Sequence, residues 1–330
     1  MTAPRIRTRI AVTAALVATG FALAGCSTQA APTPSVPPES ALGSYPVTVQ
    51  SCGQDFTYDT APSRVVLGNF RTLETLNALG VEAAVYGYLL GPDDRGVAPT
   101  GLPSGLVMVS QDTIPAREPV IAAGPDLFLS FNEAQLLGQG ALSYDDLGGI
   151  GSNAYVMGAY CAEAPNNRTI DTVFADIANL GSIFSVADRA VALNDDLRDR
   201  VAVAKESLGG STATVAFLKV IGGKVFAIGG YPASATLGAL GLGNEFGDLP
   251  TAFAELNTEQ ALAMNPDVVF VNYVGDKDAA IADLAAALPG LAAAKEGRVY
   301  GADESLAQGG GVGIINSLEA IALDVKKAGR

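Results

Sequence analysis

Short apolar runs typical of strands alternate with helix-like runs along most of this chain. One strand-like run covers residues 64–68, and the helical pattern that follows it ends at Gly80. A second covers residues 214–220, and the next helical pattern again ends at a Leu-Gly pair, at Gly241. This alternation predicts an α/β fold with a mostly parallel sheet and helices on its faces.

A motif of a glutamate, six residues and then Pro-Asp occurs twice, from Glu118 to Asp126 and from Glu259 to Asp267. Each copy predicts a short helix that starts at the glutamate and ends at Gly124 or Asn265, residues that tolerate a left-handed C-cap. The proline cannot continue the helix, and the β-branched or aromatic run after it suits a buried parallel strand. A carboxylate in a first helical turn commonly just complements the helix dipole. Its recurrence at one matched position favours a shared role in two similar lobes.

Between the two copies, apolar residues recur at spacings of three and four over residues 186–208, which predicts one long helix. Such a helix would be about 34 Å long, enough to connect two lobes. The chain therefore predicts two Rossmann-like lobes, 45–185 and 209–330, with a ligand cleft between them. Because a single helix is a stiff connector, we expect small movements on binding.

The first 25 residues resemble a bacterial lipoprotein signal peptide, with Arg5, Arg7 and Arg9 before an apolar stretch too short to span a bilayer. The sequence Leu-Ala-Gly directly before Cys26 is a lipobox, so we expect Cys26 to be lipidated and to become the first mature residue. Residues 26–44, rich in Ala, Pro, Ser and Thr, predict a disordered tether. The protein is thus expected to be secreted and held by lipid on the outer face of the cytoplasmic membrane.

The net charge bears on the class of partner, and the cysteine content bears on the state of the two remaining cysteines. Loss of the three signal arginines takes the formal charge from −14 to −17, which disfavours a nucleic-acid partner. Outside the cytoplasm, the remaining pair, Cys52 and Cys161, is most simply a disulfide, worth about 4–5 kcal/mol in the chain-entropy model.

Taken together, the lipobox, the tether, the two lobes joined by one helix and the paired Glu/Pro-Asp motif resemble the substrate-binding lipoproteins of ABC importers for iron-siderophore complexes and cobalamin, the class III periplasmic binding proteins. The resemblance covers the chain from Tyr45 onward. It implies a monomer that takes a small-molecule metal chelate, above all a ferric siderophore, to an ABC permease. By position it implies that Glu118 and Glu259 contact cationic pockets of the permease subunits.

The ligand is expected between the lobes, at loops that leave the carboxyl ends of strands. The predicted ligand-binding residues are Phe70, Arg71, Tyr88, Phe131 and Asn132 in the first lobe and Tyr231, Tyr273 and Gln308 in the second. Arg71 could hold a carboxylate or hydroxamate oxygen of a chelate. It could equally pair with Glu74 on the surface of its own helix.

The complete absence of histidine weighs on the alternatives. It disfavours direct zinc or manganese binding, and it excludes catalytic Ser-His-Asp or Cys-His arrangements. We therefore predict no catalytic residue, no resident metal and no cofactor. Cobalamin, haem with a tyrosine ligand, and bare ferric ion stay open as ligands. A lipid-anchored hydrolase that uses Glu118 and Glu259 as paired carboxylates, and a purely adhesive lipoprotein, stay open as other classes.

Overall fold

The computed structural model describes residues 45–91, 94, 102–138, 140–163, 168–249 and 253–330. The predicted signal peptide 1–25, Cys26 and the tether 26–44 lie outside these residues. Within the described part, no helix combines the length and the hydropathy needed to cross a lipid bilayer.

The first sheet has five parallel strands in the order β5-β4-β3-β6-β7. Its central strands are apolar except for the final Ser130 and are fully buried, as expected for a sheet covered on both sides. We call the part of the chain that builds this sheet the first lobe. Its strands are β3 (Val65–Leu67), β4 (Val85–Leu89), β5 (Val107–Ser110), β6 (Leu127–Ser130) and β7 (Asn153–Val156).

Helices and one hairpin surround this sheet. The antiparallel hairpin consists of β1 (Val47–Ser51) and β2 (Gln54–Tyr58). The helices are η2 (Phe70–Thr72), α1 (Leu73–Leu79), η3 (Glu82–Ala84), α2 (Arg117–Ala123), α3 (Ala134–Leu137), α4 (Tyr144–Gly149), η4 (Gly158–Tyr160) and α5 (Asp171–Ile183).

The second sheet has six strands in the order β11-β9-β8-β12-β13, with β10 paired to β8. We call the part of the chain that builds it the second lobe. Strands β8, β10, β12 and β13 are parallel to one another, whereas β9 pairs antiparallel with both β8 and β11. The strands are β8 (Thr214–Ile221), β9 (Lys224–Ile228), β10 (Gly243–Asn244), β11 (Phe253–Leu256), β12 (Val268–Tyr273) and β13 (Val299–Asp303). The helices are α7 (Ala233–Leu240), α8 (Thr258–Met264), α9 (Lys277–Ala287), α10 (Ala292–Lys295), α11 (Glu304–Gln308) and α12 (Gly311–Lys327).

The sequence predicted that the two lobes begin alike, with a strand followed directly by a helix, but the structure differs in the second lobe. In the second lobe, a hairpin separates the first strand, β8, from the helix α7 that ends at Gly241. Gly222 and Gly223 form its two-residue turn, with φ of 58° and 78°. Two consecutive positive φ values suit the tightest hairpin turns, and glycine adopts them without steric cost.

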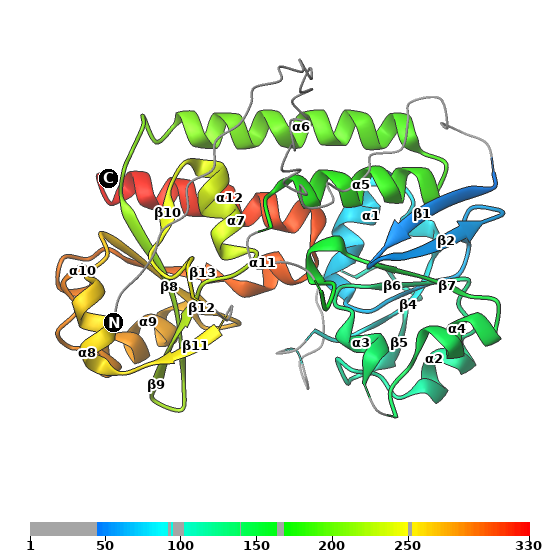
Figure 1. Cartoon of the computed structure of the whole chain (residues 1–330), viewed down its shortest axis with the longest axis horizontal. Helices are drawn as coiled ribbons and strands as arrows, with labels where there is room; N and C mark the ends of the chain where they lie inside the picture. Colours follow the sequence, from blue (N-terminus) through cyan, green and yellow to red (C-terminus); the bar gives the residue numbers. More distant parts are fainter. Residues whose placement is uncertain (1–44, 92–93, 95–101, 139, 164–167, 250–252) are drawn as a thin grey trace, which may run out of the picture. The chain divides into compact units, whose positions relative to one another are not determined.

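A single helix, α6 (Ala187–Glu206), lies between the segments that form the two sheets, nearly as predicted. Its 20 residues give a length of about 30 Å. The predicted apolar stripe is its buried face, where Ala190, Leu197 and Ala204 are buried. Helix α6 lies alongside α5 and α12 (Figure 1). The Arg200 guanidinium on α6 also donates to both carboxylate oxygens of Glu319 on α12, at 2.9 and 2.6 Å.

Both copies of the Pro-Asp motif form a short helix followed by a buried strand, as predicted. The helices α2 and α8 each begin one residue before the glutamate and end at left-handed caps, Gly124 with φ of 58° and Asn265 with φ of 43°. The aspartates have matching structural roles. Asp126 accepts from the backbone nitrogens of residues 63 and 64 before β3, and Asp267 accepts from the backbone and hydroxyl of Thr214 at the start of β8.

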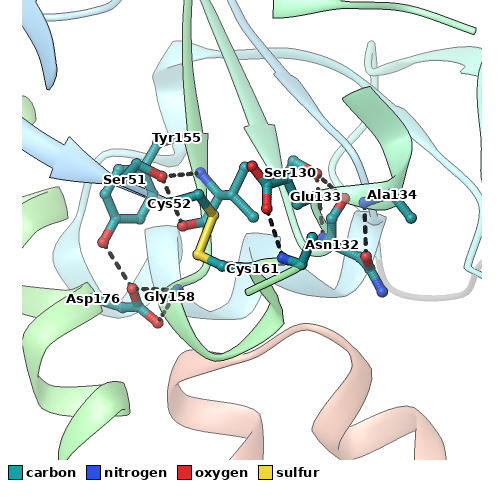
Figure 2. Close-up of a disulfide and its surroundings, with 12 residues drawn as sticks. Ser51, Cys52, Ser130, Asn132, Glu133, Ala134, Tyr155, Gly158, Cys161 and Asp176 are labelled. Carbon is teal, nitrogen blue, oxygen red and sulfur yellow. Dashed lines mark hydrogen bonds between the residues drawn. A yellow bond between two sulfur atoms is a disulfide. The ribbon is translucent and has the colours of Figure 1, made fainter. Parts of the chain in front are cut away.

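The structure contains a disulfide between Cys52, in the turn of the β1-β2 hairpin, and Cys161, which follows η4 (Figure 2). The two Cα atoms lie 5.2 Å apart and the cysteines are separated by 109 positions in the chain. The bond ties the hairpin to the end of the first sheet. The buried Glu133 carboxylate lies beside the sulfurs, but a disulfide offers no thiolate, and metals bind cysteine as thiolate.

Candidate functional site

The carboxyl ends of strands from both sheets border a cavity of about 290 Å³. Phe131 follows β6 and Tyr160 closes η4 after β7, so the first lobe provides one wall. Asn272 in β12 and Asp303 at the end of β13 provide part of the opposite wall. Ligands of open α/β sheets bind at these strand ends, so the fold places the cavity where a ligand is expected.

Aromatic side chains dominate the boundary between the two walls. The Tyr160 ring makes edge contacts with Phe131 of its own lobe, at 6.3 Å between centroids, and with Tyr231 of the second lobe, at 5.5 Å. Phe217 and Phe253 also line the cavity. Burial raises the pKa of the Tyr160 phenol, and the carboxylates of Glu304 and Asp176 raise it further. Burial likewise raises the pKa of Tyr231, so both phenols are held in the neutral form.

The cavity also contains an ion pair. Lys219 in β8 and Glu304, the first residue of α11, bring Nζ and Oε2 to 2.6 Å. The pair is largely shielded from solvent, with 22% of the lysine and 29% of the glutamate side chain exposed. Asp303 is a second carboxylate of the lining.

Three of the eight predicted ligand residues line this cavity: Phe131, Tyr231 and Gln308. The other five lie outside its lining. Phe70 and Tyr88 are buried and pack against each other at 6.1 Å between ring centroids. The Asn132 side chain accepts from the backbone nitrogen of Ala134 at the start of α3.

The remaining two predicted residues contact other parts of the chain. The Tyr273 ring packs close to Gly301 of the neighbouring strand β13. Arg71 donates to Asp94, with Nη2 and Oδ1 at 2.8 Å, and Asp94 is only 5% exposed. The alternative pairing of Arg71 with Glu74 is wrong, because the Arg71 guanidinium pairs with Asp94.

Sequence reasoning missed Tyr160, Lys219, Asp303 and Glu304. For the two carboxylates a usable pattern was present, since they follow the short strand-like run at 299–302 and a strand's carboxyl end is where ligand residues gather. Lys219 lies inside a strand that the sequence predicts as buried. Its pairing with a residue 85 positions away depends on tertiary structure.

Both motif glutamates are on the surface and neither lines the cavity. The Glu118 side chain is 78% exposed and lies 3.9 Å from the neighbouring Arg117 guanidinium. Glu259 is also exposed, in the first turn of α8. A pair of catalytic carboxylates would have to face a common substrate across one site, and these two residues lie outside the cavity.

Comparisons with known proteins agree with this architecture. Residues 65–306 match the model of the family described as "Periplasmic binding protein". No curated protein sequence matched the chain. Among solved structures, an ABC-type Fe3+-hydroxamate transport system protein from Saccharomonospora viridis is 25% identical, with a TM-score of 0.70 over 85% of this chain and 99% of that one.

Two further solved structures share the fold at lower identity. The petrobactin-binding protein YclQ from Bacillus subtilis is 19% identical, with a TM-score of 0.66 over 86% of this chain and 98% of that one. The periplasmic haem-binding protein HutB of Vibrio cholerae is 19% identical, with a TM-score of 0.63 over 79% of this chain and 97% of that one. The family match extends over most of the chain, and the two-lobed α/β fold predicted from the sequence is confirmed. This chain therefore belongs to the periplasmic binding protein family.

Proposed function

We propose that this protein captures a ferric siderophore in the cavity between its lobes and delivers it, unchanged, to the permease of an ABC importer. The observation that carries the proposal is the aromatic cavity at the strand ends of both lobes, in a member of the periplasmic binding protein family. The solved structure at 25% identity is that of an ABC-type Fe3+-hydroxamate transport system, which supports a ferric chelate as the ligand. Cobalamin and haem are alternative ligands in the same role.

The chemistry of the cavity supports an iron that arrives already coordinated. With no histidine in the chain, imidazole cannot ligate a metal. Direct Fe3+ ligation by Tyr160 or Tyr231 requires loss of a proton that burial disfavours at both phenols. The neutral rings are instead suited to packing against the apolar parts of a chelate.

Surface features support the delivery step. Glu118 and Glu259 are exposed at equivalent positions of the two lobes, where they could enter cationic pockets of the permease. Lipid attached to Cys26 would hold the protein at the membrane, with residues 26–44 as the tether.

Ferric siderophores, cobalamin and haem all absorb visible light, so equilibrium dialysis of the purified protein against each of them tests the proposal. We expect at least one ferric siderophore to be retained. Replacement of Tyr160 by alanine should weaken the affinity for that siderophore about fivefold or more, because an aromatic contact is worth about 1 kcal/mol beyond its buried area. The matched control is Tyr273→Ala, which removes a tyrosine at a strand end outside the cavity lining. If no chelate binds and the protein hydrolyses a glycan, the proposal fails and the hydrolase interpretation replaces it.

A further inference from the structure

The charged groups of the cavity define its ligand more narrowly than its aromatic rings do. Lys219, Asp303 and Glu304 are the charged side chains in the lining of the described part of the chain. The Lys219 ammonium lies 2.6 Å from Glu304, so its charge is compensated inside the protein. Asp303 adds a further carboxylate, and the lining has a net negative charge.

The same carboxylates raise the pKa of nearby phenols. Burial is the main cause that raises the pKa of Tyr160, and the Glu304 carboxylate is the next. Burial is also the main cause that raises the pKa of Tyr273, and the next is the Asp303 carboxylate, directly opposite it on the neighbouring strand. The formal charge of the whole chain, −14, is also negative.

Ferric chelates differ strongly in charge. Three hydroxamates each carry a single negative charge, so their complex with Fe3+ is neutral, and a protonated amine on the ligand makes it cationic. Three catecholates each carry two negative charges, so their ferric complex is a trianion. Like charges brought together in a cavity of low effective dielectric repel strongly, and opposite charges attract.

We infer that the carboxylates Glu304 and Asp303 make this cavity selective for chelates of zero or positive net charge, and that they exclude polyanionic ones. Glu304 has two effects, since it adds negative charge and compensates the cation that an anionic chelate would otherwise use. This inference rests on the proposed function, because it assigns the charge class of the chelate in the same cavity.

The test compares affinities of the wild-type protein for three probes: ferric desferrioxamine B, a cationic trihydroxamate; ferrichrome, a neutral one; and ferric enterobactin, a tris-catecholate trianion. We expect the cationic complex to bind at least about a hundredfold more tightly than the trianion. Glu304→Gln should narrow that ratio about tenfold, because it removes one negative charge and leaves Lys219 uncompensated. Lys219→Met should widen the ratio of the two affinities, because it removes the positive charge of the lining. Asp303→Asn should also narrow the ratio, because it removes the second carboxylate of the lining.

The matched control is Glu255→Gln, which breaks a similar Lys-Glu contact of 2.9 Å with Lys224 outside the cavity lining and should leave the ratio unchanged. Binding of the trianion as tightly as the cation by the wild-type protein would overturn the inference, while the proposed function would stand. Equal effects of Glu304→Gln on all three probes would also overturn it, since they would indicate a structural role. Retention of none of the probes, nor of any other chelate, would instead refute the proposed function.

Discussion

Because of Asp176, the free energy of unfolding of this protein should fall as the pH rises toward neutrality. The residue lies on α5 and is 4% exposed. Its Oδ1 accepts from the Tyr155 hydroxyl at 2.7 Å and from the Gly158 backbone nitrogen at 2.9 Å (Figure 2). Burial outweighs these hydrogen bonds and the attraction of Arg168, and it raises the pKa of Asp176 from 3.8 to about 7.

The sign and size of the effect follow from proton linkage. Between about pH 4 and pH 7 the folded protein keeps a proton on Asp176 that the unfolded chain releases, so the free energy of unfolding decreases as the pH rises. A shift of about three pKa units corresponds to at most about 4 kcal/mol at pH 8. Asp267 and Glu319 have lowered pKa values, so their stabilising contributions are lost only as the pH falls through those values, below this window.

The substitution Asp176→Asn isolates this effect, because asparagine keeps an acceptor oxygen for Tyr155 and Gly158 but cannot ionise. Urea unfolding, measured between pH 5 and pH 8 with the disulfide intact, should show the wild type losing stability relative to the variant as the pH rises. The control is Asp195→Asn, which removes a carboxylate that is 68% exposed and should follow the wild type in parallel. If the difference between wild type and Asp176→Asn were constant over this range, the reasoning would be refuted.

Three other features give direct predictions. Replacing Cys52 and Cys161 together by serine should lower the free energy of unfolding by about 4–5 kcal/mol at neutral pH, measured by urea titration, since the bond closes a loop of 109 positions; an unchanged midpoint would contradict this. Replacing Glu118 and Glu259 together by alanine should abolish siderophore-dependent iron uptake by cells and leave chelate affinity unaltered, whereas a loss of affinity would place these carboxylates at the ligand. Replacing Cys26 by serine should release the protein from the membrane fraction into the medium or periplasm, as detected by immunoblotting, and retention would argue against lipidation at this position.

The parts of the fold that the sequence predicted correctly depend on local chemistry. Gly80, Gly124, Asn265 and Gly241 end helices because each must adopt a positive φ there, and a left-handed cap depends on few neighbours. The long helix was predictable because its apolar positions repeat with the helical period. The hairpin inserted after β8 had a local indication too, since Gly-Gly between apolar runs is typical of a tight turn.

The site was harder to predict, because its contacts join distant residues. Arg71 has an acidic neighbour one helical turn away at Glu74, yet its guanidinium pairs with Asp94, 23 positions along the chain. Lys219 and Glu304 are separated by 85 positions and meet only when β8 and β13 join one sheet. Pairing of this kind follows from the order of strands, which a pattern of apolar residues does not specify.

The repeated motif separates two sets of residues in each lobe. Glu118 is exposed in the first turn of α2, whereas Phe131, which follows β6, lines the cavity. Glu259 is exposed in the first turn of α8, whereas Asn272 in β12 lines the cavity. Asp126 and Asp267 link each motif to the start of the first strand of its sheet through backbone hydrogen bonds. In the function that we propose, capture of the chelate and contact with the permease therefore use different residues of the same helix-strand unit, so a change in one set can leave the other intact.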